Sequence, residues 1–179
     1  SLSMLIGRSR DVRMLVVYGY ARLVGYDTNF NIVPDILESI DAKGEKLFTM
    51  KLRKGHRWSD GQPFTTDDFR YFWDDVANNK ELSPTGPPSD LLVNGEAPEV
   101  EILDKQTVRY SWSKPNPDFL PRMAGASPLF IFRPAHYLKK FHRKYNSNVG
   151  EAQAGGGVKR GWAAVHNRED NMYQFDNPK

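Results

Sequence analysis

Two pairs of adjacent aspartates are the first residues in this chain that could do acid–base chemistry. They are Asp67 with Asp68 and Asp74 with Asp75. Neighbouring residues on a helix point about 100° apart, so the two members of a pair would not face the same substrate. Capping and solvation of a helix explain these carboxylates better than catalysis does. The sequence therefore predicts no carboxylate catalyst here.

The other reactive side chains also lack the spacing that a known chemistry requires. Four histidines are present, no two of them four residues apart and none completed by a glutamate of a metal motif: His56, His136, His142 and His166. Ser83 and Ser89 lie in a loop without the Gly-x-Ser-x-Gly context of a hydrolase. The run Gly155 to Gly157 precedes Val-Lys-Arg, which is not a phosphate loop. We therefore expect no metal, no cofactor and no enzymatic activity, and binding is the remaining class of function.

The composition predicts a folded globular protein. Hydrophobic residues make up 39% and aromatic residues 12% of the chain. The 25 basic and 22 acidic side chains give a net charge of only +3, so no nucleic-acid partner is expected. The basic and aromatic stretch 133–145 is explained by a solvated helix face. Zero cysteines exclude disulfides and thiolate metal sites without fixing the compartment.

The elements that would carry a binding site begin with a helix and a hairpin. Apolar residues recur at helical spacing across residues 11–26, which predicts an amphipathic helix capped by Asp11. Pro34 allows an edge strand but not a central one. Residues 35–53 are predicted to form a hairpin, because apolar and polar side chains alternate along its second half.

A turn and a capped helix follow this hairpin. Gly61 can take a positive φ in a tight turn, and Thr65 with Asp68 resembles a capping box. We expect Arg70 to pair with Asp74 one turn further along. The predicted buried stripe of the helix consists of Phe69, Phe72, Trp73 and Val76.

The second half of the chain alternates loops and short elements. Residues 79–99 are predicted to be a long loop, because Pro, Gly, Ser and Asn are dense there. A second hairpin is expected over residues 100–112 and a helical turn within 115–125. A short apolar strand is expected over residues 128–134. Pro134 would then start a helix whose apolar stripe is Tyr137, Leu138, Phe141 and Tyr145, and the tail holds one further short helical candidate.

The stretch from Phe48 to Val76 resembles a segment of the bacterial extracellular solute-binding proteins of family 5. These are the peptide, oligopeptide and nickel receptors of ABC importers. Their pattern is a strand ending in Leu-Arg-x-Gly, then an aromatic residue, Asp-Gly-x-Pro-Phe, and a helix with a Trp. It is filled here by Leu52, Arg53, Gly55, Trp58, Asp60, Gly61, Pro63, Phe64, Asp67 or Asp68, Phe69 and Trp73.

An earlier stretch is similar to the family as well, and the later hairpin and helix resemble its oligopeptide-type members. Together the similar segments run from Val12 to Lys179. The matches in the earlier stretch are Gly19, Leu23, Tyr26, Asp27, Pro34, Leu37, Glu38 and Ser39.

This resemblance implies an α+β fold, with antiparallel hairpins and packed helices. It would be a fragment of a two-lobed periplasmic-binding-protein-like fold of class II, which carries an extra domain. Residues 1–34 would start the first lobe, and residues 35–150 would form the extra domain. Residues 151–179 would be a tail leading toward a remainder that is missing from this sequence. The rings of Trp58 and Trp73 are expected in the core.

The function that the resemblance implies is that of the substrate-binding component of an ABC importer. It would capture peptides or similar small solutes for a membrane permease. It would lie in the periplasm or outside the cell, or be anchored to the membrane as a lipoprotein in the full-length parent. The residues expected to border the ligand cleft are Leu82, Ser83, Pro84 and Thr85. The alternatives are a solute-sensing module of a transcriptional regulator and a hydrolase domain.

Overall fold

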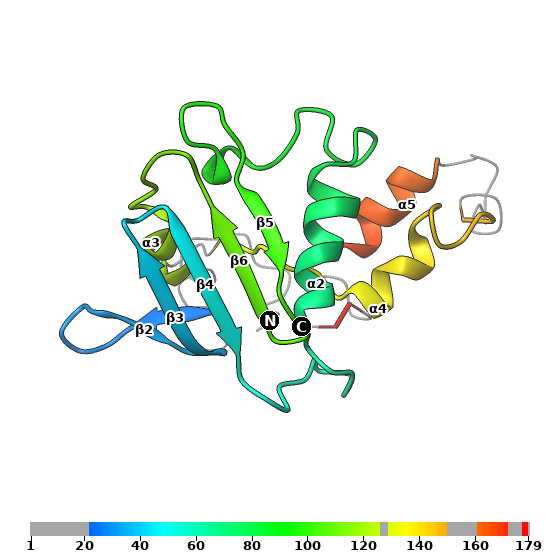
Figure 1. Ribbon diagram of the computed structural model, residues 1–179. Helices are drawn as coiled ribbons and strands as arrows, with labels where there is room; N and C mark the ends of the chain where they lie inside the picture. The colour runs from blue at the N-terminus through cyan, green and yellow to red at the C-terminus, as the bar shows by residue number, and fades with distance from the viewer. Residues whose placement is uncertain (1–21, 126–128, 150–160, 172–176, 179) are drawn as a thin grey trace, which may run out of the picture.

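A four-stranded antiparallel sheet forms the centre of the structure, a computed structural model that describes residues 22–125, 129–149, 161–171 and 177–178. In Figure 1, α3 lies behind this sheet, and α2, α4 and α5 lie beside its β5 edge. In spatial order the strands of the sheet are β3 (Leu37–Lys43), β4 (Leu47–Leu52), β6 (Thr107–Ser111) and β5 (Glu99–Ile102). A separate antiparallel ladder joins β1 (Val24–Tyr26) to β2 (Ile32–Pro34).

The helices of the described residues are short. One continuous helix consists of α2 (Thr66–Arg70) and the π-helical η1 (Tyr71–Ala77). The remaining helical segments are η2 (Ser89–Leu91), α3 (Phe119–Ala124), α4 (Ala135–Leu138), η3 (Lys139–Phe141) and α5 (Trp162–Glu169).

Both predicted hairpins are confirmed. In the first, Lys43 pairs with Leu47 across a turn that contains Gly44 and Glu45, both at positive φ. In the second, Ile102 pairs with Val108, and the turn contains the predicted Asp104 and Lys105. The alternation in β4 is confirmed too, because its buried residues are Phe48, Met50 and Leu52. The predicted α+β class with an antiparallel sheet therefore holds.

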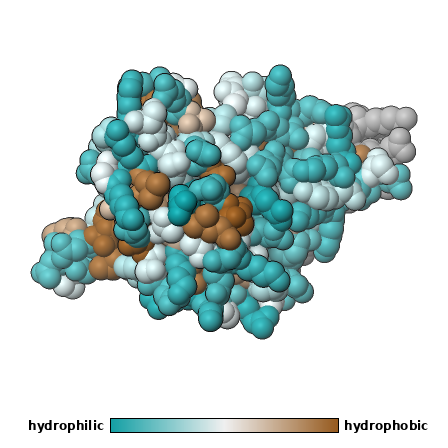
Figure 2. All heavy atoms as spheres, viewed as in Figure 1, coloured by the Kyte–Doolittle hydropathy of each residue, from teal (hydrophilic) through white to brown (hydrophobic). Residues whose placement is uncertain are grey.

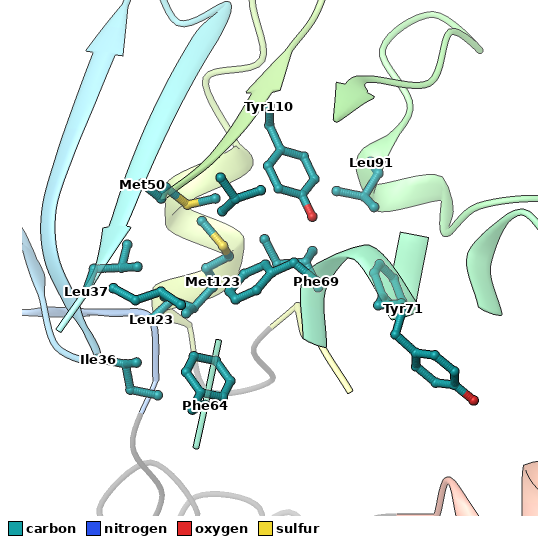
Figure 3. Close-up of a cluster of buried hydrophobic side chains, with 14 of the residues drawn as sticks. Leu23, Ile36, Leu37, Met50, Phe64, Phe69, Tyr71, Leu91, Tyr110 and Met123 are labelled. Atoms are coloured by element: carbon teal, nitrogen blue, oxygen red, sulfur yellow. The ribbon is translucent and has the colours of Figure 1, made fainter. Parts of the chain in front are cut away.

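The core lies between one face of the sheet and the helices that cover it. Figure 3 shows side chains from β3, β4, β6, α2 and α3 meeting there. The opposite face of the sheet carries charged pairs such as Arg109 with Glu101 and Lys51 with Glu38. Figure 2 shows a mostly hydrophilic surface with apolar areas near the end of β5 and beside β2. The two central strands, β4 and β6, thus bury every second residue, and this alternation made a period of two detectable in the sequence.

Tyr110 brings a hydroxyl into this core, and that hydroxyl has no hydrogen-bond partner among the described residues. In Figure 3 it points across the core toward Leu91. Burial raises the pKa of Tyr110. An unpaired buried hydroxyl costs about 1–3 kcal/mol, so we expect Tyr110→Phe to raise the free energy of unfolding by about 1 kcal/mol in urea denaturation.

The matched control is Tyr137→Phe, because the Tyr137 hydroxyl donates to the carboxylate of Glu169 at 2.9 Å. Removing a paired hydroxyl is expected to cost about 0.5–1.5 kcal/mol. A loss of stability in Tyr110→Phe would contradict the assignment of its hydroxyl as unpaired.

Two predicted elements are wrong in part. Residues 24–26 of the predicted first helix form β1, since Val24 pairs with Pro34 and Tyr26 with Ile32. The part of the prediction before residue 22 lies outside the described residues. Of the predicted strand 128–134, the described part 129–134 has no strand partner. It runs against α2 instead, where the backbone N–H of Arg133 donates to the carbonyl of Asp68 at 3.1 Å.

Three finer predictions are also corrected. Arg70 pairs with Asp67 and not with Asp74. Pro134 is the cap that precedes α4 and not its first residue. The helical stretch that follows ends at Phe141 in η3, so Tyr145 lies outside it and is exposed. The helical candidate in the tail is confirmed as α5.

Candidate functional site

A single buried carboxylate, that of Asp68, fixes the turn before the central helix. Its Oδ2 accepts the backbone N–H of Thr65 at 3.0 Å and the indole N–H of Trp58 at 3.1 Å. Its Oδ1 accepts the backbone N–H of Ala135 at 3.0 Å. Burial raises the pKa of Asp68, and these hydrogen bonds oppose the shift. The predicted capping box is confirmed, and Asp68 also ties α2 to the start of α4.

The turn itself has the conformation that its sequence predicts. Gly55 and Gly61 both adopt positive φ, near +80° and +84°. Trp58 is buried, with its ring centroid 5.2 Å from that of Phe64. Its predicted place in the core is confirmed, whereas Trp73 is only half-buried at the margin of the core. The motif thus serves to position the helix that follows it.

The far end of that helix holds a second buried carboxylate. The carboxylate of Asp75 accepts a hydrogen bond from the Lys144 ammonium at 2.6 Å and another from the Tyr145 hydroxyl at 2.6 Å. Its neighbour Asp74 is exposed, as Asp67 is beside Asp68. Adjacent aspartates therefore do not share a site, as predicted from helical geometry. Asp75 instead anchors the segment after η3 to η1.

A cavity of about 550 Å³ opens where η1 ends. Its walls come from residues 74–75 and 78–81 on one side and 142–144 on the other. The charges on both sides are largely paired with each other: Lys144 pairs with Asp75, and Arg143 pairs with Glu81 at 2.8 Å. The lining is polar and charged, so this hollow suits water and ions better than an apolar ligand.

The four residues predicted to border the ligand cleft follow this cavity in the chain. Leu82 is half-buried against the core, and Ser83 is half-buried with its N–H bonded to the carbonyl of Asn79 at 2.7 Å. Pro84 and Thr85 are exposed. The predicted loop 79–99 is confirmed apart from the short η2 and from Glu99, which begins β5. The four residues therefore lie together, ordered by a turn at the C-terminal end of the central helix.

Two histidines that are distant in the sequence lie close together beside η1. The ring centroids of His142 and His166 are 5.6 Å apart, and both side chains are buried. The His166 Nε2 lies 2.7 Å from the Tyr71 hydroxyl. Nothing in the spacing of the sequence indicates this contact, which depends on the packing of α5. The stretch 133–145 is consequently not a solvated helix face, because His142 is buried and Arg133 pairs with Asp170 at 2.8 Å.

Within the described residues no group of three or more His, Asp or Glu side chains has the geometry of a metal site. The same residues contain no helix with the length and apolar character needed to cross a bilayer.

Residues 31–157 match the model of the bacterial extracellular solute-binding proteins, family 5, in its middle region. That match covers more than half of the chain, so the protein belongs to this family of solute-binding proteins.

Individual relatives agree with the family. The periplasmic alpha-galactoside-binding protein of Rhizobium meliloti is 34% identical over 118 residues, which cover 63% of this chain and 16% of that protein. The periplasmic oligopeptide-binding protein OppA of Escherichia coli is 29% identical over 131 residues, which cover 66% of this chain and 24% of OppA.

Solved structures show the same fold. The structure of an oligopeptide-binding protein OppA aligns with a TM-score of 0.76 at 27% identity, covering 97% of this chain and 27% of that one. The binding protein MelB from Agrobacterium fabrum, in complex with stachyose, aligns with a TM-score of 0.59 at 26% identity, covering 83% and 21%.

The chain spans less than a third of the length of these relatives. The predicted fold class is thereby confirmed: the structure corresponds to part of a periplasmic binding protein. The family and the named relatives are binding proteins.

Proposed function

We propose that the protein is the solute-binding component of an ABC importer, which captures a peptide or a similar small solute and delivers it to a membrane permease. The observation that carries this proposal is the family match over residues 31–157. The structural similarity to OppA over nearly the whole chain supports it. Such a protein binds and releases its ligand without chemical change, so it is not an enzyme.

The proposed place of action is the periplasm or the outside of the cell. The names of the curated relatives from Rhizobium meliloti and Escherichia coli, which are periplasmic binding proteins, support this location. A receptor there would meet its permease at the outer side of the cytoplasmic membrane.

The proposed contribution of this chain is one wall of a ligand cleft. Residues 1–34 would belong to the first lobe, 35–150 to the extra domain and 151–179 to the connection beyond it. The wall residues would be Leu82, Ser83, Pro84 and Thr85. Pro84 and Thr85 are exposed, and Gly86 completes the turn with φ of +86°, so the loop can present its surface without a change of fold. A peptide held mainly through its main chain would leave side-chain specificity broad.

Calorimetry on the intact protein that carries this sequence tests the proposal. The ligands are a panel of di- to hexapeptides and, as a second arm, an α-galactoside such as stachyose. We expect peptide binding with a Kd of about 1 μM, equal to about −8 kcal/mol. Binding of the sugar but not of the peptides would support the proposed receptor function and would identify the solute as a sugar and not a peptide. Binding of neither class would contradict the proposal.

Substitution of Thr85 by tryptophan tests the proposed wall. A bulky ring at this exposed loop position is expected to obstruct the cleft and to weaken ligand binding at least tenfold, equal to about 1.4 kcal/mol. The matched control is Lys105→Trp, another exposed position, in the turn that contacts the opposite end of the central helix through Thr66. Equal effects of the two substitutions on ligand binding, or no effect of the Thr85 substitution, would contradict the assignment of this loop to the ligand cleft.

A further inference from the structure

His166 lies at the buried contact between α5 and η1. Its side chain is fully buried, and its Nε2 lies 2.7 Å from the Tyr71 hydroxyl. Its Nδ1 is buried as well and has no hydrogen-bond partner among the described residues. Figure 3 shows the Tyr71 side chain leaving the apolar core, which places its hydroxyl on the side where α5 packs. In a neutral imidazole with its proton on Nε2, that N–H donates to the Tyr71 hydroxyl, and Nδ1 carries no proton that needs an acceptor.

Burial favours the neutral form of the neighbouring His142, against the effect of its hydrogen bond to Asp75. Its Nε2 is 3.2 Å from the carbonyl of Asp75, an acceptor, and its Nδ1 accepts the backbone N–H of Lys144 at 3.2 Å. A proton on Nδ1 would oppose that second donor. His142 therefore cannot supply an acceptor to His166, and if charged it would repel a charged His166.

The α5 helix also holds the start of the loop that follows η1. The Trp162 indole N–H donates to the Glu81 carboxylate at 2.7 Å, and the Arg143 guanidinium lies 5.5 Å from the centre of the Trp162 ring while it pairs with Glu81. Glu81 directly precedes Leu82–Thr85. Displacement of α5 would therefore remove one of the tethers of this loop.

We propose that His166 is an acid-sensitive latch, whose protonation releases α5 from η1 and loosens residues 81–85. An imidazolium carries an N–H on both nitrogens and requires an acceptor for each. Tyr71 provides one acceptor, and the described residues provide none for Nδ1. A buried donor that also carries charge is costly, and exposure of His166 to water relieves that cost.

The sign of the pH dependence follows from the two states of the helix. Burial lowers the pKa of His166 to about 4, with further lowering by His142 and Arg133 and an opposing effect of Asp75. In the released helix the pKa returns to about 6.5. The released state therefore takes up the proton first. The equilibrium constant for packing of α5 against η1 is therefore constant above about pH 6.5. It falls about tenfold per pH unit down to about pH 4, which amounts to about 300-fold in total.

Other titratable groups around the contact modify this dependence. Burial raises the pKa of Asp170, against the effect of Arg133, so the docked state takes up that proton more readily and gains stability at the acid end of the range. The pKa of His142 is lowered by burial, which adds to the acid release. Further titratable or charged groups in contact with α5 or with His142 are Tyr71, Asp75, Glu81, Arg133, Tyr137, Arg143, Lys144 and Tyr145.

The test is hydrogen exchange of the backbone amides in 162–170 and 81–85, between pH 7.5 and pH 4, corrected for the intrinsic exchange rate. In the unaltered protein we expect local opening to rise with acid as described. In His166→Gln we expect a shallower profile that keeps only the contributions of His142 and Asp170, because the amide nitrogen of glutamine can reach the position of Nε2 but does not titrate. The control His136→Gln, on α4 facing Asp60, keeps the original profile. A flat profile in the unaltered protein, or a slope in His166→Gln equal to that of the unaltered protein, overturns the proposal.

A direct titration covers the case in which His166→Gln does not fold. The NMR resonances of the four histidine rings in the unaltered chain give one midpoint each. A midpoint for His166 below about 5 supports the latch, and a midpoint at or above about 6 overturns it. This outcome is independent of ligand binding, so the latch and the proposed transport function can fail separately.

Discussion

Replacing Asp68 by alanine is expected to lower the free energy of unfolding by about 3–5 kcal/mol. The Asp68 side chain is 3% exposed and accepts N–H groups from Thr65, Trp58 and Ala135. Its removal leaves these donors buried without an acceptor, and it disconnects the turn, the central helix and α4 at once. Urea denaturation followed by tryptophan fluorescence measures the loss, and the Trp58 indole is itself one of the affected donors.

The neighbouring Asp67 supplies the control for this prediction. Asp67 is exposed, lies in the first turn of the same helix and pairs with Arg70 at the surface. Asp67→Ala is expected to cost no more than about 1 kcal/mol, because exposed ion pairs and helix-dipole effects are small. Similar losses at the two positions would show that capping charge, and not the buried hydrogen bonds of Asp68, explains the motif.

The predictions that held are those that depend on contacts close in sequence. The hairpins could be predicted because β4 and β6 bury every second residue, and because the turns contain residues suited to sharp reversal. The capping box is legible because Thr65 and Asp68 lie within one helical turn of each other. The resemblance to family 5 rests on the same short stretch, so fold and family were predicted together.

The predictions that failed needed partners far along the chain. Residues 24–26 have apolar spacing compatible with a helix, yet they pair with β2 and their strand packs against α3. Residues 129–133 have the apolar pattern of a strand but join neither edge of the sheet, because they run against α2, where the Arg133 N–H donates to the carbonyl of Asp68. Ile131 is buried without being in a strand. Tertiary packing decided both outcomes against local propensity.

The same limit applies to the site. Sequence reasoning placed Leu82–Thr85 in one loop, and the structure orders that loop at the end of the central helix. It could not connect Asp68 with Ala135, nor His166 with Tyr71, because each pair joins distant segments. The four histidines were judged by their spacing for metal ligation, a test that does not detect a buried histidine paired with a tyrosine.

The second large effect is expected at Phe119, the aromatic residue of α3 that fills the centre of the core. It is fully buried, and its ring centroid lies 4.8 Å from that of Trp112, 5.0 Å from that of Phe48 and 5.4 Å from that of Tyr110. Phe119→Ala removes a large apolar side chain and leaves a cavity among rings that cannot close around it. We expect a loss of about 3–5 kcal/mol in the free energy of unfolding.

Phe30 provides the matched control, because the same substitution there deletes the same atoms from a side chain that is 85% exposed. Phe30→Ala is expected to change the stability by no more than about 0.5 kcal/mol. Phe119→Leu, which keeps most of the buried volume, should fall between the two at about 1.5 kcal/mol or less. If Phe119→Ala cost no more than Phe30→Ala, the rings of β4 and β6 would form a core without α3. The helix would then be a surface attachment and not the layer that closes the sheet.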